Sequence, residues 1–318
     1  MMKPSCIVTG ATGYIGSRVV KHLLNEGWSV SIITQPTSAF DNIGDVVDKV
    51  RVCEYDGHID TLIAFFDKMQ ADVVMHLAAA VITNPSPKQV KVLVDSNVGF
   101  GAEVLEAMRH SRTRLFVGTG SYWQNYNSDD YNPADLYAAT KEAFEKILQY
   151  YVDAHGFRAI TLRLFDVYGE DDKRPKLWNL LRDIAGTDRS IDISSGEQLL
   201  DMVHVSDVAR AYEAAYSWLC NHPELRNEVY GVDSGVRMSL RDIVELFREV
   251  IAKPINLNWG ARPYKSREVM KPATSYVRLP NWSAKVQIMK GLSKFNRGGV
   301  ILSLEPIAPC CILNGIAA

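Results

Sequence analysis

The chain has 318 residues, of which 47% are apolar and 23% charged, and 35 basic residues nearly balance 37 acidic ones. This composition excludes disordered, collagen-like and disulfide-framework proteins, and a formal net charge of −2 argues against a surface devoted to nucleic acid or to an anionic membrane.

The cysteines are odd in number and scattered along the chain. They are Cys6, Cys53, Cys220, Cys310 and Cys311, and no spacing of a metal site occurs among them. No apolar run reaches the roughly 18 residues of a membrane span, and the amino terminus lacks the apolar core of a signal peptide. We therefore expect a soluble, reduced, cytoplasmic protein without a metal centre.

Short apolar runs alternate with amphipathic stretches over the first half of the chain. The runs predict strands at Cys6–Thr9, Ser29–Thr34, Val50–Cys53, Asp72–Leu77, Arg114–Thr119 and Ala159–Leu164. Helical patterns lie between them, at Tyr14–Glu26, Ile59–Lys68, Val90–Arg109 and Pro133–His155. Gly27 and Gly156 stand where a left-handed residue would close a helix. This alternation predicts an α/β fold of the Rossmann type, with a doubly wound parallel sheet.

The second half is less regular, although a helix at Ser206–Cys220 and a strand at Glu228–Val232 are expected to rejoin the sheet. We expect a sheet domain, a smaller discontinuous domain over the carboxyl ends of its strands, and a tail without an assigned role. In that order, these parts span residues 1–165 with 206–235, residues 166–205 with 236–296, and residues 297–318.

The segment Thr9–Gly16, with the sequence TGATGYIG, stands between the first predicted strand and the first predicted helix. Gly10 permits a tight turn, Gly13 lets the backbone approach a pyrophosphate, and Gly16 allows close packing of helix and sheet. The helix amino terminus adds free N–H groups and the positive end of its dipole. Strand, glycine turn and helix together predict a dinucleotide site rather than an ordinary turn.

Tyr137 and Lys141 lie four residues apart in a predicted helix, which Asn132 would cap and Pro133 would open. Residues at this spacing share a helix face, and a nearby ammonium favours a phenolate, so the phenol could transfer protons. The alternative is a core tyrosine beside a solvated lysine, but after the glycine turn we favour catalysis. The buried stripe of this helix is predicted to comprise Leu136, Ala143, Ile147 and Tyr151.

Two hydroxyl groups, those of Thr119 and Ser121, lie at the end of the fifth predicted strand in the sequence GTGSYWQ. The carboxyl ends of parallel strands face the ligand crevice, so either hydroxyl could bind a substrate oxygen beside Tyr137. Spacing alone does not choose between them, and a turn of small residues is the alternative.

These motifs together resemble the extended short-chain dehydrogenases/reductases, and specifically the NAD-dependent epimerase/dehydratase family that acts on nucleotide sugars. The resemblance covers nearly the whole chain to about Phe295. Besides TGATGYIG and YAATK, it rests on His76–Ala79 (HLAA), Asn97 at the opening of the following helix, Leu162–Gly169 (LRLFDVYG) and His204–Ala209 (HVSDVA).

The resemblance implies an enzyme and gives the matching residues roles. Tyr137 would be the general acid/base, and Lys141 would lower its pKa and bind the nicotinamide ribose. Thr119 would be the hydroxyl partner, with Ser121 as substitute. Within the expected cofactor site, Asp56 would contact adenine. That site comprises Gly10, Thr12, Gly13, Tyr14, Ile15, Gly16, Thr34, Asp56, Leu77, Ala78, Ala79, Tyr137, Lys141 and Val167, the last beside the nicotinamide. The expected substrate contacts are Trp123, Asp166, Lys265 and Arg267.

Departures from the family pattern narrow the expected reaction. The 4,6-dehydratases follow their active-site Thr with an Asp-Glu pair, whereas Gly120 follows Thr119 here, which argues against a dehydratase. Asp166 replaces the usual Asn, and Leu200 replaces an Arg that customarily contacts the sugar nucleotide. Cations of the segment 262–268, RPYKSRE, could bind a diphosphate instead, and a solvated charged loop is the alternative.

The segment Gly120–Tyr126 looks most like the deoxysugar branch of the family, which includes CDP-abequose and CDP-paratose synthases. We therefore expect a reductase of a nucleotide-linked 4-keto-6-deoxysugar in surface-polysaccharide (O-antigen) synthesis. A nucleotide-sugar 4-epimerase would use the same groups, and a non-sugar reductase is a third hypothesis. A non-catalytic NAD(P) sensor is disfavoured because Tyr137 and Lys141 are both present.

The cofactor preference is predicted from the end of the second strand. About 18 residues after Gly16, where NAD-specific folds carry a carboxylate, the chain has Thr34, followed by the uncharged Gln35 and Pro36. Arg18 could add positive charge if its side chain reaches back. We therefore predict a modest preference for NADPH over NADH.

The predicted partners are a nucleotide-sugar substrate and a second copy of the chain. In the family, the helices that correspond to Val90–Arg109 and Pro133–His155 commonly form the dimer interface, so a homodimer is expected. Neither nucleic acid nor a membrane is expected as a partner.

Overall fold

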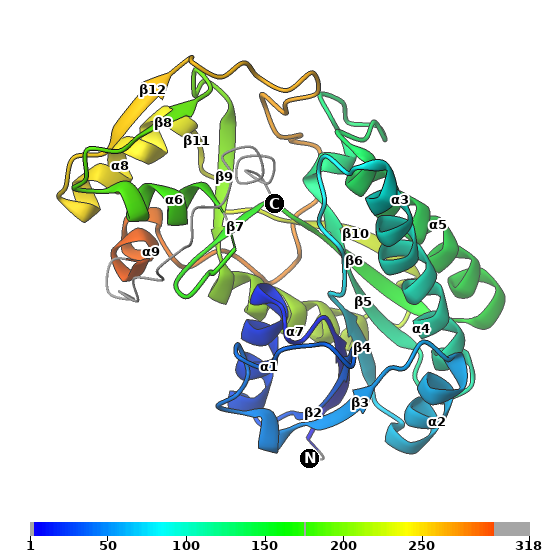
Figure 1. The fold of residues 1–318 in the computed structure, drawn as a ribbon. Helices are drawn as coiled ribbons and strands as arrows, with labels where there is room; N and C mark the ends of the chain where they lie inside the picture. The colour runs from blue at the N-terminus through cyan, green and yellow to red at the C-terminus, as the bar shows by residue number, and fades with distance from the viewer. Residues whose placement is uncertain (1–2, 175, 296–318) are drawn as a thin grey trace.

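The computed structural model describes residues 3–174 and 176–295, so the tail assigned to 297–318 lies outside the described residues (Figure 1). A seven-stranded sheet dominates its first half. The strands are β1 (Ser5–Thr9), β2 (Ser29–Thr34), β3 (Arg51–Glu54), β4 (Val73–His76), β5 (Leu115–Ser121), β6 (Arg158–Leu164) and β10 (Asn227–Val232). Their order is β10-β6-β5-β4-β1-β2-β3, with every neighbouring pair parallel. The order reverses between β1 and β4, where such sheets open a ligand crevice.

Helices cover both faces of this sheet (Figure 1). One face carries α1 (Tyr14–Asn25) and α7 (Val205–Asn221), and the other carries α2 (Ile59–Met69), α4 (Phe100–Arg109) and α5 (Leu136–His155). Successive strand residues point to opposite faces. In β1, accordingly, Val8 packs in the core under α1 and α7, whereas Ile7 packs in the core under α2, α4 and α5.

The predicted α/β fold is confirmed. Each of the six strands predicted before residue 165 lies within two residues of its predicted ends, and β10 rejoins the sheet beside β6 as expected. Gly27 and Gly156 follow α1 and α5 with φ values of 83° and 67°, the left-handed conformation predicted for them.

The start of α5 differs from the prediction. Asp135 caps the helix by accepting the backbone N–H of Ala138 at 2.8 Å, so Asn132 is not the cap and Pro133 is not in the helix. The N–H of Asn132 instead donates to the carbonyl of Gln124 at 2.9 Å. The predicted buried stripe is wrong at Leu136 and Ala143, which are exposed, and right at Tyr151, which is buried, and at Ile147, which packs against the core. The side chains buried on this helix include Tyr137, Lys141, Phe144 and Leu148.

The predicted helix Val90–Arg109 is present in three pieces, α3 (Pro87–Val94), a π turn at Asp95–Gly99 and α4. Asn97 therefore lies inside a π turn rather than at a helix opening. Its side chain bonds both backbone polar groups of Ala80, and a π turn is a common way to re-aim one side chain at a functional site.

The chain builds a second, smaller core beside the carboxyl ends of the large sheet (Figure 1, upper left). It contains a three-stranded sheet, a strand pair and three helices. These are β7 (Asp166–Tyr168), β9 (Leu199–His204) and β11 (Arg237–Ser239), β8 (Ser190–Ile193) and β12 (Asn256–Trp259), and α6 (Leu177–Ile184), α8 (Leu240–Ile251) and α9 (Ile288–Phe295).

A later segment returns to the large sheet before α9. Arg278 forms a β-bridge with Gly231 of β10, and the indole N–H of Trp282 donates to the carbonyl of Asp207 in α7 at 3.0 Å. The buried Asp207 carboxylate then accepts the backbone N–H groups of Lys285 and Val286 at 3.0 and 2.9 Å. Across residues 3–174 and 176–295, every helix is too short or too polar to traverse a bilayer.

Candidate active site

The glycine turn between β1 and α1 leaves no room for side chains at two positions. Gly10 has a φ of 68°, and a Cβ atom on it would lie 2.6 Å from the backbone nitrogen of Ala78. A Cβ atom on Gly16 would lie 2.0 Å from the carbonyl oxygen of Gly10. Gly13 is the N-cap residue of α1, and no side chain of the described residues caps that helix start. Its first N–H groups are therefore available to an anion, as a dinucleotide site requires.

The loop after β4 lies directly against this turn and is held by two buried side chains. The Thr9 hydroxyl accepts the N–H of Ala78 at 3.1 Å and bonds His76 Nδ1 at 2.9 Å. Asn97 accepts the N–H of Ala80 and donates to the Ala80 carbonyl and to the Thr140 hydroxyl, at 2.7, 2.9 and 2.9 Å. Through Asn97, the expected cofactor contacts Leu77, Ala78 and Ala79 are tied to α5.

Tyr137 and Lys141 are both buried on one face of α5, with the lysine Nζ 5.9 Å from the centre of the tyrosine ring. Burial lowers the pKa of Lys141 to about 8, with Glu145 opposing the shift. Burial also raises the pKa of Tyr137 above its usual value, and the Asp135 charge adds to that rise while Arg174 opposes it. The expectation that Lys141 lowers the pKa of Tyr137 during turnover therefore stays a prediction.

A buried ionic cluster underlies the pair and was not found from the sequence. The Arg163 guanidinium donates to the Glu145 carboxylate of α5 at 2.9 Å and also donates to the side-chain amide oxygen of Gln124. Gln124 donates to Glu142 at 2.8 Å and accepts the backbone N–H of Ser121 at 2.9 Å. The end of β5 and the helix that carries Lys141 are therefore held by one set of side chains.

The structure separates the two candidate hydroxyl groups. Thr119 donates to the carbonyl of His76 at 2.7 Å and lies 2.5 Å from the Tyr212 hydroxyl of α7, so its oxygen is engaged inside the fold. Ser121 is the last residue of β5, and its oxygen caps the turn that follows by accepting the backbone N–H groups of Trp123, at a long 3.3 Å, and of Gln124. Ser121 is consequently the better placed of the two to bind a ligand.

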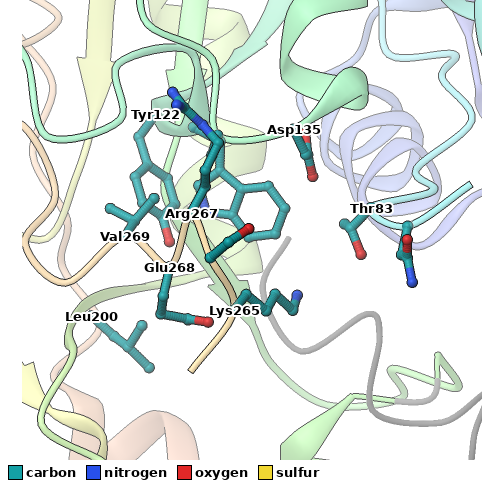
Figure 2. Close-up of a pocket in the computed structure, with 12 residues that line it drawn as sticks. Thr83, Tyr122, Asp135, Leu200, Lys265, Arg267, Glu268 and Val269 are labelled. Carbon is teal, nitrogen blue, oxygen red and sulfur yellow. The ribbon is translucent and has the colours of Figure 1, made fainter. Parts of the chain in front are cut away.

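A cavity of about 280 Å³ lies between the end of β5, the start of α5 and the segment after β12 (Figure 2). It brings together three of the expected substrate contacts, Trp123 from the turn after β5 and Lys265 and Arg267 from the segment after β12. Lys265 Nζ lies 5.9 Å from the Trp123 ring centre. The full lining is Thr83, Asn84, Tyr122, Trp123, Ala134, Asp135, Leu200, Lys265, Ser266, Arg267, Glu268 and Val269.

Two of the expected substrate contacts are engaged with the protein itself. Arg267 donates to the Pro133 carbonyl at 3.0 Å and stacks 4.3 Å over the Tyr126 ring. Asp166 lies outside the cavity lining, where its buried carboxylate accepts the Tyr122 hydroxyl at 3.1 Å. Burial raises the pKa of Asp166, and the Lys176 ammonium opposes that shift.

The side chains around the expected adenosine end are arranged as follows. Thr34 is buried at the end of β2, and its hydroxyl lies 3.5 Å from the carbonyl of Cys53. Asp56 accepts the His58 N–H and the Thr61 hydroxyl at the start of α2. Arg18 does not reach back, because its guanidinium forms an ion pair with Asp171 at 2.7 Å.

The remaining expected cofactor contacts are partly structural. The carbonyl of Thr12 accepts the Asn42 side chain at 2.8 Å, and Ile15 packs on the core under α1. The Tyr14 ring is buried, with the Arg174 guanidinium 4.6 Å from its centre. Val167 is buried in β7, at the junction between the two cores.

Several known proteins are similar to this chain over most of its length. CDP-abequose synthase of Salmonella muenchen is 25% identical over 291 residues, which are 91% of this chain and 95% of that protein. UDP-glucose 4-epimerase of Streptomyces lividans is 26% identical over 285 residues, which are 80% of this chain and 83% of that protein. Among solved structures, a UDP-glucose 4-epimerase from Thermotoga maritima superposes with a TM-score of 0.78 at 21% identity, covering 92% and 98%.

A family-level match agrees with these relatives and with the geometry described above. The model of the NAD dependent epimerase/dehydratase family matches residues 6–228, which include the glycine turn, Ser121, Tyr137 and Lys141. This chain belongs to the NAD dependent epimerase/dehydratase family.

Proposed function

We propose that this protein is an NAD(P)H-dependent reductase of a nucleotide-linked 4-keto-6-deoxysugar. The observation that carries the proposal is the buried Tyr137–Lys141 pair of α5, with Gly120 and Ser121, not an acidic pair, at the end of β5. Both lie close in sequence to residues that line the cavity, Asp135 and Tyr122 among them. Such a site can protonate a carbonyl oxygen, whereas the two positions after Thr119 on β5 carry no carboxyl group that could expel a hydroxyl group. The CDP-abequose synthases among the relatives support a deoxysugar substrate.

The glycine turn fits a dinucleotide because Gly10 and Gly16 leave only backbone at its surface and α1 offers uncapped N–H groups. When bound, the reduced nicotinamide supplies a hydride to C4 of the sugar. Tyr137 donates the proton to the C4 oxygen, and its burial keeps the phenol protonated until that step. Lys141 would hold the nicotinamide ribose and stabilise the phenolate that Tyr137 leaves until a proton from solvent restores the phenol, while the Ser121 hydroxyl would position the substrate carbonyl.

A 4-epimerase is the second candidate, since UDP-glucose 4-epimerases are also among the relatives. An epimerase returns the hydride to the sugar and needs no net supply of cofactor. We expect the reductase to consume one added NADPH for each molecule of a CDP- or dTDP-linked 4-keto-6-deoxysugar, as followed by absorbance and product mass. Interconversion of two 4-hydroxy epimers with only bound cofactor would instead establish the epimerase.

We further propose that NADPH is preferred over NADH. Neither Thr34 nor its neighbours Gln35 and Pro36 would repel a 2′-phosphate, although Arg18 does not contribute charge. Wild-type kcat/KM is expected to be about tenfold higher with NADPH, or ~1.4 kcal/mol. Thr34→Asp should reverse that preference, whereas Thr34→Ser should keep it. A wild-type preference for NADH would refute the proposal.

We infer a homodimer paired through α3 and α5. Val90 and Val94 lie one turn apart on α3 and are 39% and 43% exposed, and Tyr150 on α5 is 59% exposed, so apolar area is available for a partner. Sedimentation at micromolar concentration should give twice the mass of one chain.

We also infer that the protein is cytoplasmic. The free thiols of Cys6, Cys53 and Cys220 support this inference.

A further inference from the structure

Asp135 occupies a position between the catalytic helix and the cavity. It caps α5 two residues before Tyr137, with Oδ1 accepting the N–H of Ala138 at 2.8 Å, and its side chain lines the cavity opposite Lys265 (Figure 2). A carboxylate has about four acceptor positions. Capping uses only part of this capacity, so acceptor positions remain for a ligand in the cavity.

Capping of α5 does not require the negative charge of Asp135. A serine caps a helix about as well and carries no charge to desolvate. Burial raises the pKa of Asp135 to about 6, while the Lys265 ammonium opposes the rise. The backbone N–H groups of Ala138 and Tyr137 already reach this carboxylate, and its remaining acceptor positions are costly in such a place unless further donors meet them. The natural donor is a hydroxyl group of the substrate.

A second carboxylate, that of Glu268, also lines the cavity, but it lies at the end of the cavity away from Asp135. Burial raises the pKa of Tyr122, Asp166 and Tyr137; the Glu268 charge adds to the rise at Tyr122 and Asp166, whereas the Asp135 charge adds to the rise at Tyr137. In Figure 2, Asp135 lies on one side of the cavity, and Glu268 and Val269 lie on the other. Asp135 is therefore the carboxylate beside the proton donor.

A 4-keto-6-deoxysugar has two different groups next to its reacting carbonyl. C3 carries a hydroxyl group or, in a 3-deoxy sugar, only hydrogen, and C5 carries the methyl group. A methyl group beside a carboxylate would desolvate it without a hydrogen bond, whereas Trp123, Leu200 and Val269 offer apolar walls. With the C4 oxygen at Tyr137, the donor that meets Asp135 is the hydroxyl on C3.

We propose that Asp135 is a specificity-determining residue, which accepts a hydrogen bond from the substrate's 3-hydroxyl group and selects sugars that retain it over 3-deoxy sugars. This inference rests on the proposed reductase. It places the substrate among 4-keto-6-deoxysugars with an intact 3-hydroxyl, rather than among the 4-keto-3,6-dideoxysugars.

The test compares CDP-4-keto-6-deoxyglucose with CDP-4-keto-3,6-dideoxyglucose, and the dTDP forms of both, using the full-length protein and NADPH. Wild-type kcat/KM is expected to favour the 3-hydroxy sugar by about 10- to 100-fold, the usual value of a hydrogen bond to a charged group. Asp135→Ser should lower that ratio at least about tenfold, mainly by raising KM for the 3-hydroxy sugar. Its Tm should stay within a few degrees, because serine still caps α5.

Glu268→Gln is the matched control, because it neutralises the other carboxylate of the cavity and should keep the wild-type ratio. Turnover of both sugars without discrimination, or an unchanged ratio in Asp135→Ser, would overturn the role of Asp135 alone. If the ratio fell in Glu268→Gln instead, the selecting residue would be Glu268, and the proposed role of Asp135 would again be wrong. If neither sugar consumes NADPH, the proposed reductase falls, and this role of Asp135 falls with it.

Discussion

Replacing Tyr137 with Phe is expected to lower kcat by about 10²- to 10⁴-fold, the usual contribution of a positioned acid. The ring is buried and packs against Lys141, and phenylalanine preserves that packing while removing the proton. Dinucleotide affinity should therefore change by less than about twofold, or ~0.4 kcal/mol. Steady-state reduction of a 4-keto sugar gives kcat, and fluorescence titration with NADPH gives the affinity.

Tyr168→Phe is a suitable control for this variant. The Tyr168 hydroxyl is also buried, and none of the described residues forms a hydrogen bond with it, so its removal should leave kcat nearly unchanged. If Tyr137→Phe retained more than about a tenth of the wild-type kcat, a loss far below that of a general acid, Tyr137 would not be the proton donor.

Gly16→Ala is expected to weaken dinucleotide binding by about 100-fold, or ~2.7 kcal/mol. The added Cβ atom would lie 2.0 Å from the Gly10 carbonyl oxygen and 2.7 Å from the carbonyl carbon, so the turn backbone must move. That backbone is the surface that faces the pyrophosphate. Isothermal titration with NADPH, together with Tm with and without it, would measure the loss.

Gly99→Ala provides the comparison at a glycine without this constraint. Gly99 has a φ of −59°, and a Cβ atom on it would meet nothing closer than 3.9 Å, so alanine should fold and bind as the wild type does. Normal NADPH affinity in Gly16→Ala would show that the turn does not hold the dinucleotide.

The parts of the fold that depend on local chemistry were predictable from the sequence. Strand periodicity, the glycine turn and the positive φ of Gly27 and Gly156 each follow from residues within one turn or one strand. The start of α5 was mispredicted because Asn132 and Asp135 are both good caps. A tertiary contact decided between them, since the N–H of Asn132 is held by the carbonyl of Gln124.

The finer arrangement of the site depends on residues far apart in the sequence. Thr119 and Ser121 could not be distinguished until Tyr212, 93 residues after Thr119, was seen to engage the threonine hydroxyl. The buried stripe of α5 was misjudged for a related reason. Lys141 counts as polar in any hydropathy pattern, yet it is 3% exposed in the structure. Functional polar groups thus occupy positions that a hydropathy pattern reserves for apolar ones.

The repeated passage of the chain between its two cores limits how such an enzyme can change its substrate. The chain leaves the large sheet after β6, returns with α7 and β10, leaves again with β11, and touches β10 and α7 once more at Arg278 and Trp282 before α9. The residues of the smaller core are consequently not continuous in the sequence, so recombination could not exchange this core as one segment. A chimera would need several matched crossovers, each made inside contacts such as those of Asp207. New specificity is more accessible through single substitutions in the cavity wall, where a cap residue such as Asp135 can change without rebuilding either core.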